Sequence, residues 1–325
     1  MSHSLHPHTN YPSRQAPPAW RRLAWLVRLF WLFLVLLGSS AWAASSNLVT
    51  PLEPNHHGLP LVKVKLQRRD GDRREALMLV DTGASISVLD QSVASCFWEA
   101  DPASRGQAGW VRSASGVPVP AQAISLHGIE CGPISLQGPS ALRMDLGALN
   151  STLEVPIAGI IGMKLLARQT FRVDFRGRAI QWGVGPEGAY VQELQIRDDR
   201  SAPTLRLEVA GRAIEATCDS GATGFLELCQ ADAQGLRQCT RSQANRRIID
   251  LQGMQHQASF QMVSGQVRLG SRHWSEPEVQ VGARNILGVQ AMWPSVWFDF
   301  KNNRVGFSMG SDRGLESRPG DGQAL

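Results

Sequence analysis

The chain has 325 residues, of which 43% are apolar and 19% are charged, a composition typical of a globular protein with room for two domains. Its formal net charge of +5 depends on the N-terminal segment, because four of the 33 basic residues and none of the 28 acidic residues precede Ala44. Without that segment, 29 basic residues face 28 acidic ones, a net charge of +1. This balance removes the main support for a nucleic-acid partner.

The first 43 residues have the order of a secretory signal peptide. Arginines come first, an apolar run from Leu29 to Leu37 follows, and small residues lead to Ala43. We expect cleavage after Ala43, with the chain exported to the periplasm or secreted. The alternative is an uncleaved membrane anchor, although this apolar run is short for a spanning helix, which needs about 20 residues. Residues 44–56 are predicted to be a tether.

Two segments further along share one pattern, an apolar strand that ends in Asp-Thr/Ser-Gly-Ala. Asp81 stands in the first, Leu-Met-Leu-Val-Asp-Thr-Gly-Ala, and Asp219 in the second, Ala-Thr-Cys-Asp-Ser-Gly-Ala. A single Asp-Thr-Gly is often only a turn, because aspartate caps its own backbone and glycine accepts positive φ. Two copies behind matching strands indicate a pair of carboxylates that could share one proton and hold one water between them.

The residues around these segments repeat as well. Apolar and polar residues alternate over 62–66 before the first aspartate and over 205–209 before the second, which predicts a hairpin in each case. Residues 111–118 and 249–256 each have the pattern of a later hairpin with glycine at its tip. The chain is therefore interpreted as an internal duplication.

Two more landmarks recur in the same order. Each half has two apolar residues before a glycine, namely Ile160, Ile161 and Gly162, and Ile286, Leu287 and Gly288. Asp174 and Asp299 follow in apolar strands and are interpreted as structural. Short strands separated by glycine turns predict an all-β fold of two pseudo-twofold-related β-barrel lobes with a cleft between them. We place these lobes at 57–184 and 185–309, and a disordered tail at 310–325.

The five cysteines leave two interpretations open. In an oxidising compartment Cys229 could pair with Cys239, and Cys96 with Cys131, which would leave Cys218 free. All five could equally be reduced and mostly buried, because free cysteine packs as a small apolar residue. No cysteine pair or His/Cys cluster has the spacing of a metal site, and no cofactor is expected.

With these landmarks the chain resembles the aspartic protease superfamily, and in detail its retropepsin-like branch. The resemblance covers about residues 60 to 307 and rests on the two aspartate loops and the two apolar-apolar-Gly signatures. Retroviral members are homodimers that contribute one aspartate each, whereas this chain carries both and so looks like a fused, single-chain version. The resemblance implies that Asp81 and Asp219 form a catalytic dyad.

The same resemblance assigns roles to the neighbouring residues. Thr82 and Ser220 would hydrogen-bond across the pseudo-twofold axis, and Gly83 and Gly221 would let backbone N–H groups approach the carboxylates. The two apolar-apolar-Gly signatures would lie in a ψ-shaped sheet beside each aspartate. A flap hairpin would close over the substrate, its candidate residues being Ser113, Ala114, Ser115 and Gly116.

The chain also departs from the pepsin pattern. Ala84 and Ala222 follow the catalytic glycines, where pepsins have hydroxyl residues, and this implies a higher pKa and a less acidic optimum than pepsin has. The two tyrosines, Tyr11 and Tyr190, lie away from the predicted flap, so a pepsin-type flap tyrosine is absent. Trp110 lies near that flap and is the residue that could substitute for it.

These features favour an exported aspartic endopeptidase that acts as a monomer on a peptide or protein substrate bound as an extended strand. The alternative is a catalytically silent periplasmic peptide-binding or sensing module on the same fold. An inert envelope protein would explain the export signal but not the paired loops. No nucleic-acid partner is expected, and membrane association through the N-terminal segment remains open.

Overall fold

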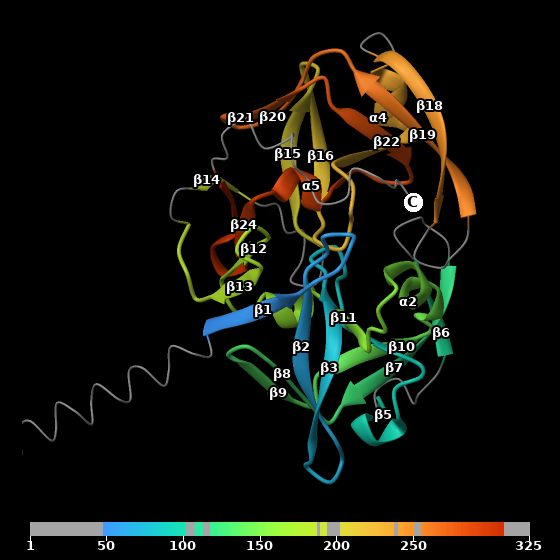
Figure 1. Cartoon of the computed structure of the whole chain (residues 1–325), viewed down its shortest axis with the longest axis vertical. Helices are drawn as coiled ribbons and strands as arrows, with labels where there is room; N and C mark the ends of the chain where they lie inside the picture. The colour runs from blue at the N-terminus through green and yellow to red at the C-terminus, as the bar shows by residue number, and fades with distance from the viewer. Residues whose placement is uncertain are drawn as a thin grey trace, which may run out of the picture. The chain divides into compact units, whose positions relative to one another are not determined.

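The computed structural model describes residues 48–101, 108–112, 118–186, 189–193, 202–236, 240–249 and 255–308. Strands predominate in these residues and the helices are short, so the predicted all-β class is confirmed (Figure 1). No helix in the described ranges combines the length and apolarity needed to cross a bilayer.

The first half of the described chain is built mainly from short strands. Its elements are β1 (Val49–Glu53), β2 (Leu61–Gln67), β3 (Arg73–Val80), β4 (Val88–Asp90), η2 (Ser95–Phe97), β5 (Trp98–Ala100), β6 (Ala108–Arg112), β7 (Pro118–Leu126), β8 (Gly128–Cys131), β9 (Ile134–Gln137), β10 (Ser140–Met144), α2 (Gly147–Leu153), β11 (Gly159–Ile161), α3 (Met163–Leu166), β12 (Phe171–Asp174) and β13 (Ala179–Trp182).

The second half has a similar composition of elements. They are β14 (Ala189–Glu193), β15 (Thr204–Val209), β16 (Arg212–Cys218), β17 (Leu226–Cys229), α4 (Gln230–Gly235), β18 (Thr240–Ile249), β19 (Gln255–Val263), β20 (Gln266–Leu269), β21 (Arg272–Ser275), β22 (Glu278–Gly282), β23 (Ile286–Leu287), α5 (Val289–Met292), β24 (Ser295–Asp299), η4 (Phe300–Asn302) and β25 (Arg304–Ser308).

The predicted hairpins before the two aspartates are present. In β2, Val62, Val64 and Leu66 are buried while Lys63 and Lys65 are exposed, which is the alternation of a strand with one face on the core. β2 pairs antiparallel with β3 over its whole length, and β15 pairs with β16 in the same way. Figure 1 shows both as long two-stranded ribbons.

Part of the predicted tether is a strand instead. Residues 49–53 form β1, which pairs antiparallel with β13 on one side and with β2 on the other. Thr50 and Leu52 are buried, whereas Val49 is exposed. The sequence pattern did not reveal this strand because it has five residues with Pro51 at its centre, and because β13 lies far along the chain.

Both halves arrange their strands in the same order. The first runs β2-β3-β11-β4-β10-β7, and the second runs β15-β16-β23-β17-β22-β19. The strand that precedes each aspartate, β3 or β16, is parallel to its short apolar neighbour, β11 or β23. The next pairs match in direction too, because β11 is antiparallel to β4 and β23 is antiparallel to β17. The internal duplication predicted from the sequence is therefore present in the strand pairing.

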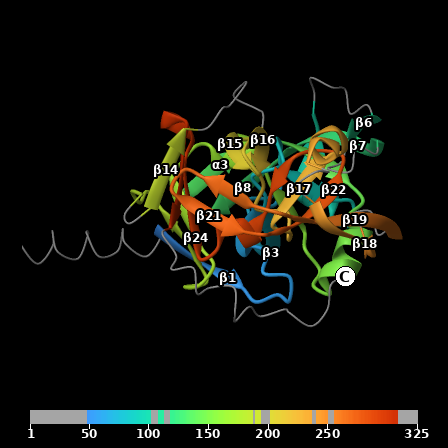
Figure 2. The same cartoon turned by 90° about the horizontal axis from the view of Figure 1, so that it is seen from above.

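Strands from both halves also join in one sheet. β12 pairs with β24 so that Phe171 lies opposite Phe298, and β24 continues through β25 to β14. Figure 2 shows β14 next to the red strands of the C-terminal end. The Phe171 ring packs against Trp182 and Phe298 with centroid distances of 5.5 and 5.2 Å. Aromatic packing of this kind adds to the stability that burial provides, and here it connects the two halves.

The strand pairing does not produce two closed barrels. In the described residues it gives one sheet of 16 strands and one of nine, and neither path returns to its first strand. In the larger sheet β24 and β25, from the end of the chain, pair with the first half through β12. This shared pairing carries the larger sheet across both halves.

The Cys96–Cys131 disulfide, one of the two interpretations left open, is not formed. Both residues are free thiols, and they lie in different surroundings. Cys131 is fully buried in β8, and its burial raises the pKa of its thiol to about 12. The carbonyl of Cys96 accepts a hydrogen bond from the amide of Arg69, next to the turn of the β2–β3 hairpin.

Cys218 and Cys229 are free thiols too. Cys218 is fully buried at the end of β16, and this burial raises the pKa of its thiol. The Sγ of Cys229 donates to Asp232 Oδ2 at 3.3 Å. Cys239, the partner predicted for Cys229, lies outside the described residues.

Candidate active site

The two predicted catalytic aspartates stand directly after strands β3 and β16. The amide of Asp81 donates to the carbonyl of Ile161 at 3.0 Å, and the amide of Asp219 donates to the carbonyl of Leu287 at 3.0 Å. The backbone of each aspartate is thereby attached to the parallel strand beside it. The four apolar residues of the signatures on β11 and β23 are buried: Ile160, Ile161, Ile286 and Leu287.

Gly162 and Gly288 touch the backbone of the two aspartate loops. A Cβ on Gly162 would lie 2.5 Å from the carbonyl carbon of Ile86 and 2.8 Å from the carbonyl oxygen of Ala84. A Cβ on Gly288 would lie 2.7 Å from the carbonyl oxygen of Ala222. Backbone atoms cannot rotate away as side chains do, so only glycine fits without displacing the loop.

Thr82 and Ser220 exchange hydrogen bonds between the two loops, as the sequence predicted. The Thr82 hydroxyl donates to the carbonyl of Cys218 at 2.7 Å and accepts from the amide of Ser220 at 3.0 Å. The Ser220 hydroxyl donates to the carbonyl of Val80 at 2.8 Å and accepts from the amide of Thr82 at 3.0 Å. Both side chains are fully buried. These four bonds fix one aspartate loop against the other.

Gly83 and Gly221 bring the backbone against the carboxylates. The amide of each donates to the aspartate two residues earlier, Asp81 or Asp219, at 2.7 Å. A Cβ on Gly83 would lie 2.6 Å from Asp219 Oδ1, and a Cβ on Gly221 would lie 2.7 Å from Asp81 Cγ. Each glycine therefore binds the carboxylate of its own loop and leaves room for the carboxylate of the other.

The two carboxyl groups are buried next to each other. Asp81 is 9% exposed and Asp219 is 8% exposed, and their side chains hydrogen-bond to one another. Burial raises the pKa of both, because it disfavours the charged form. Repulsion by Asp219 raises the pKa of Asp81 further. Backbone amides that hydrogen-bond to the carboxylates act in the opposite direction but do not cancel this rise.

The chemistry available to such a pair follows from its electrostatics. Two adjacent buried carboxyl groups cannot both ionise at low cost, so they titrate as a unit that holds one proton. The pair then contains one carboxylate that can accept a proton and one carboxylic acid that can donate one. Within the described residues no group of three His, Cys, Asp or Glu side chains could hold a metal ion.

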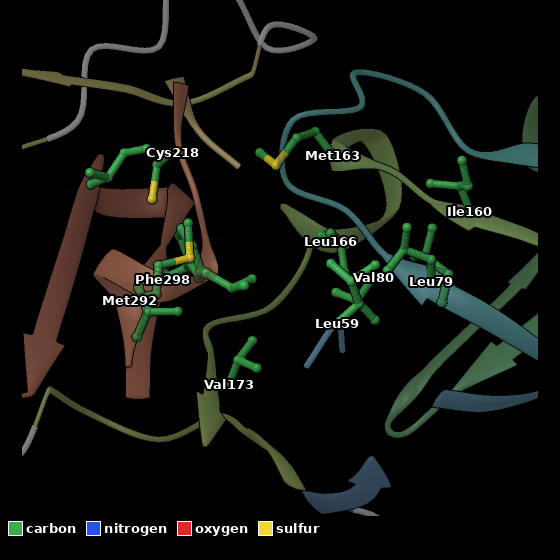
Figure 3. Close-up of a cluster of buried hydrophobic side chains, with 14 of the residues drawn as sticks. Leu59, Leu79, Val80, Ile160, Met163, Leu166, Val173, Cys218, Met292 and Phe298 are labelled. Atoms are coloured by element: carbon green, nitrogen blue, oxygen red, sulfur yellow. The ribbon is translucent and has the colours of Figure 1, made fainter. Parts of the chain in front are cut away.

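Buried apolar side chains from both halves surround the strands that carry the aspartates. Val80 and Cys218, the residues immediately before them, are fully buried. Figure 3 shows Met163 and Leu166 on the side of Val80, and Met292 on the side of Cys218. This packing keeps the carboxyl groups in surroundings of low polarity, which is the cause of their raised pKa.

Two prolines support the site and were not singled out from the sequence. The carbonyl of Pro60 accepts from the amide of Val80 at 2.9 Å, and the carbonyl of Pro203 accepts from the amide of Cys218 at 2.8 Å. Both prolines come immediately before the first strand of their hairpin, β2 or β15. This matching position was a signal in the sequence that could have identified them.

The predicted flap residues Ser113, Ala114, Ser115 and Gly116 lie outside the described residues. The strands on either side, β6 and β7, pair antiparallel with Arg112 opposite Pro118. The second half has an equivalent hairpin of β18 and β19, with Ile249 opposite Gln255. Trp110 stands on β6 and is 72% exposed, so it is not a core residue.

Asp174 and Asp299 are both engaged in local contacts away from the dyad. Asp174 accepts from the amide of Gly177 at 2.7 Å. Asp299 is buried, which by itself favours its neutral form, but hydrogen bonds from Asn302 and Arg304 outweigh burial and lower its pKa. These contacts agree with the structural role inferred from the sequence.

Residues 62–165 match the model of a family described as aspartyl protease. The resemblance noted in the sequence is thereby confirmed for this segment, which includes Asp81 and ends before Asp219. No match was found among curated proteins. Among solved structures the chain is similar to the crystal structure of basic 7S globulin from soybean, with 14% identity and a TM-score of 0.46, over 86% of this chain and 99% of that one.

Proposed function

Because the chain carries an aspartyl protease segment, we propose that the protein is an aspartic endopeptidase that hydrolyses peptide bonds with Asp81 and Asp219. The observation that carries this proposal is the buried, hydrogen-bonded pair of carboxyl groups, held by reciprocal contacts from both loops. A binding protein gains nothing from burying two carboxyl groups side by side, since their repulsion is costly. Perturbed pairs of this kind are typical of catalytic sites.

In the proposed reaction the ionised carboxylate takes a proton from a water molecule as that water attacks the peptide carbonyl. The protonated carboxyl group donates its proton to the oxygen on which charge develops. The roles then exchange, so that the departing amine is protonated and the pair regains its single proton. No cofactor is required, because both proton transfers use the aspartates.

We place the substrate in a cleft between the two halves, bound as an extended strand by main-chain hydrogen bonds. The hairpins β6–β7 and β18–β19 occupy equivalent positions in the repeat and are the elements we expect to cover it. Both aspartates come from one chain, so the proposed enzyme needs no second copy and acts as a monomer.

The proposal includes export. Its support is the order of basic, apolar and small residues that ends at Ala43. β1 begins at Val49, so cleavage there would leave all described strands intact. We therefore propose a periplasmic or secreted enzyme, held at the membrane if the segment is not cleaved.

The test is hydrolysis of a diverse unstructured peptide pool by the chain from Ala44 onward, scanned from acidic to neutral pH. Asp81→Asn and Asp219→Asn keep the shape of the site but remove an ionisable carboxyl group. We expect each to reduce kcat by about 10²–10⁴-fold, the usual contribution of a positioned acid or base. Asp174→Asn is the matched control, and it should cleave at the rate of the unchanged chain.

Cleavage that survives in both dyad variants would contradict the proposed mechanism. Peptide binding without cleavage by the unchanged chain would favour the silent binding module. Binding is therefore measured in parallel, by fluorescence anisotropy of labelled peptides from the same pool.

A further inference from the structure

The outward face of strand β1 is apolar. Val49 and Pro51 point away from the core and are exposed, whereas Thr50 and Leu52 are buried. The polar residue therefore faces inward, where the Thr50 hydroxyl accepts a hydrogen bond from the Trp182 indole at 2.9 Å. This is the reverse of the usual alternation, in which the polar side chains of a half-buried strand face solvent.

The neighbouring strand β2 follows the usual alternation, with Lys63 and Lys65 facing outward. Leu48, directly before β1, adds to the apolar group, because its side chain is 42% exposed and that of Val49 is 50% exposed. Three large apolar side chains are exposed in the described residues, and these two are adjacent. A single exposed apolar residue is ordinary, but a group of them indicates an interaction site.

Arg172 lies on the same face of the sheet. Val49 pairs with Gln181 across β1 and β13, and Gln181 pairs with Arg172 across β13 and β12. Residues directly opposite each other in adjacent strands point to the same side, so these three side chains form one row. Figure 1 shows the three strands side by side. The Arg172 guanidinium donates to the carbonyl of Gly185 at 3.0 Å, which fixes its position in the row.

The turn between β12 and β13 adds two more arginines. Arg176 and Arg178 are exposed, and the carbonyl of Arg178 accepts from the amide of Leu52 at 2.9 Å, so the turn lies beside β1. Asp174, which pairs with Ala179 at the start of this turn, offsets one positive charge. We define the β1 face as Leu48, Val49, Pro51, Arg172, Arg176 and Arg178. It combines apolar side chains with a net positive charge.

This charge decides which partner fits the β1 face. A twofold contact with a second copy would bring two sets of arginines into one interface, where like charges repel each other. An anionic partner would neutralise them instead. Apolar side chains bordered by arginines are typical of protein surfaces that bind anionic lipid, because the apolar groups enter the interface and the guanidinium groups contact phosphates.

The position of the β1 face in the chain favours the bilayer among anionic partners. The apolar run of the N-terminal segment ends at Leu37, so ten residues separate it from Leu48. Ten residues span at most about 35 Å when fully extended. A membrane that holds the apolar run therefore has the β1 face within that reach, and the face begins at the first described residue.

We propose that the β1 face binds the surface of an anionic bilayer, with Leu48 and Val49 in the lipid interface and the three arginines on lipid phosphates. Binding uses only the folded part of the chain, so it persists after cleavage at Ala43 and keeps the exported protein on the membrane as a peripheral protein. The inference does not depend on the reaction of Asp81 and Asp219.

The experiment is co-sedimentation with vesicles of the chain from Ala44, which keeps both strand partners of β1. One set of vesicles is phosphatidylcholine alone, and the other contains phosphatidylglycerol in addition. We expect binding to the anionic vesicles only, and weaker binding as salt is added, because salt screens the arginines. Thermal unfolding of every protein used checks that its fold persists.

Two double variants test the two components of the β1 face. Leu48→Ser with Val49→Ser should weaken binding on the order of tenfold, because two apolar side chains no longer leave water. Arg176→Gln with Arg178→Gln should weaken it about fivefold for each arginine, the usual contribution of a basic residue at an anionic surface.

Arg268→Gln with Arg284→Gln is the matched control. It also removes two exposed arginines, but from the second half of the chain, at β20 and before β23. This control should bind anionic vesicles as the unchanged chain does. Equal losses in the control and in the Arg176/Arg178 variant would show attraction by net charge alone and would overturn the proposed surface.

Three other results would also overturn the inference: no binding to anionic vesicles, equal binding to neutral ones, or unchanged binding by both β1-face variants. Sedimentation velocity tests the second copy, since a dimer that Leu48→Ser with Val49→Ser abolishes would assign the face to self-association. Peptide hydrolysis is measured separately. A chain that binds vesicles but cleaves no peptide would contradict the proposed function and leave this inference standing.

Discussion

The loop that carries Asp81 and the loop that carries Asp219 receive the same backbone support from different residues. Each aspartate amide is bound by the parallel strand beside it, and each loop lies against a glycine of the apolar-apolar-Gly signature. Thr82 and Ser220 make the same pair of bonds across the interface. Further along the loops, Ile86 and Gly224 make the same backbone contact with Gly162 and Gly288, but their side chains differ.

The difference indicates where the duplicated unit is constrained. Residues that contact the other half are constrained by both aspartate loops, because a displaced atom there would shift both carboxylates. Ile86 and Gly224 lie further from the other loop, at a half-buried and an exposed position respectively, and their side chains differ. The comparison therefore separates positions that hold the two loops together from positions that do not contact the other loop.

The largest effect is expected when a methyl group is placed between the two aspartate loops. Gly83→Ala or Gly221→Ala would place a Cβ against the opposite carboxylate, at 2.6 Å from Asp219 Oδ1 in the first case. We expect a loss of kcat/KM on the order of a hundredfold or more, because small displacements of reacting groups are that costly. The measurement is steady-state hydrolysis of a pool-derived peptide. Gly185→Ala is the control, and equal activity in all three variants would contradict the tight packing.

The next effect comes from the exchanged hydroxyl groups. Ser220→Ala would leave the carbonyl of Val80 and the amide of Thr82 without their partner in a buried site. The free energy of unfolding should fall by about 1–3 kcal/mol for each group left unpaired. The separate variants Ser220→Thr and Thr82→Ser keep the hydroxyl group and should retain most of the stability of the original chain. Denaturant unfolding of the four proteins decides the matter, and a Ser220→Ala chain as stable as the original would argue against these bonds.

A third effect concerns pH, where the dyad and Asp299 should behave oppositely. Burial raises the pKa of Asp81 above its ordinary value of 3.8, so the folded chain holds a proton that the unfolded chain releases. The resulting stability is fully present below 3.8 and is lost as pH rises through the raised pKa. The original chain should therefore lose stability relative to Asp81→Asn as pH rises from acidic to neutral.

Asp299 supplies the contrast in the same measurement. Its pKa is lowered, so its stabilisation is present above the ordinary value of 3.8 and is lost as pH falls through the lowered pKa. Asp299→Asn should thus cost stability at neutral pH and little in acid. Denaturant unfolding over a pH series gives both curves, and parallel slopes for the two variants would contradict the opposite directions.

The smallest effect lies outside the dyad. Arg304 pairs with Asp299 at 3.2 Å, but its side chain is 44% exposed and therefore screened by solvent. Arg304→Gln should lower the free energy of unfolding by about 1 kcal/mol or less and leave kcat/KM unchanged. A loss of activity in this variant would contradict the expectation that the Arg304–Asp299 pair has no effect on the dyad.

Much of the site could be predicted from the sequence, because its features are local or repeated. The two aspartate loops, the hairpins before them and the apolar-apolar-Gly signatures are short patterns, each present twice. The glycines were predictable as close-approach positions. The structure adds the reason for each, since Gly83 and Gly221 leave room for the opposite carboxylate rather than only for their own.

Other features could not be predicted because they depend on partners far along the chain. The strand at 49–53 was missed since its neighbours are β13 and β2, and the absence of a Cys96–Cys131 bond depends on where two separate elements come to lie. The pairing of β12 with β24 joins strands of both halves in the 16-strand sheet, where two separate barrels had been predicted. None of these contacts produces a recognisable pattern of apolar and polar residues in the segments that make it.

The sequence by itself determined the class of the fold, the duplication and the identity of the paired carboxyl groups, because strand alternation, glycine turns and repeated motifs are encoded within short segments. Only the tertiary structure decided the raised pKa values of the two carboxyl groups and the different surroundings of the two aspartate loops. Burial and repulsion depend on the distance between Asp81 and Asp219, and the open space at Gly224 depends on what does not pack there. Both are properties of atoms brought together by folding, which no single segment contains.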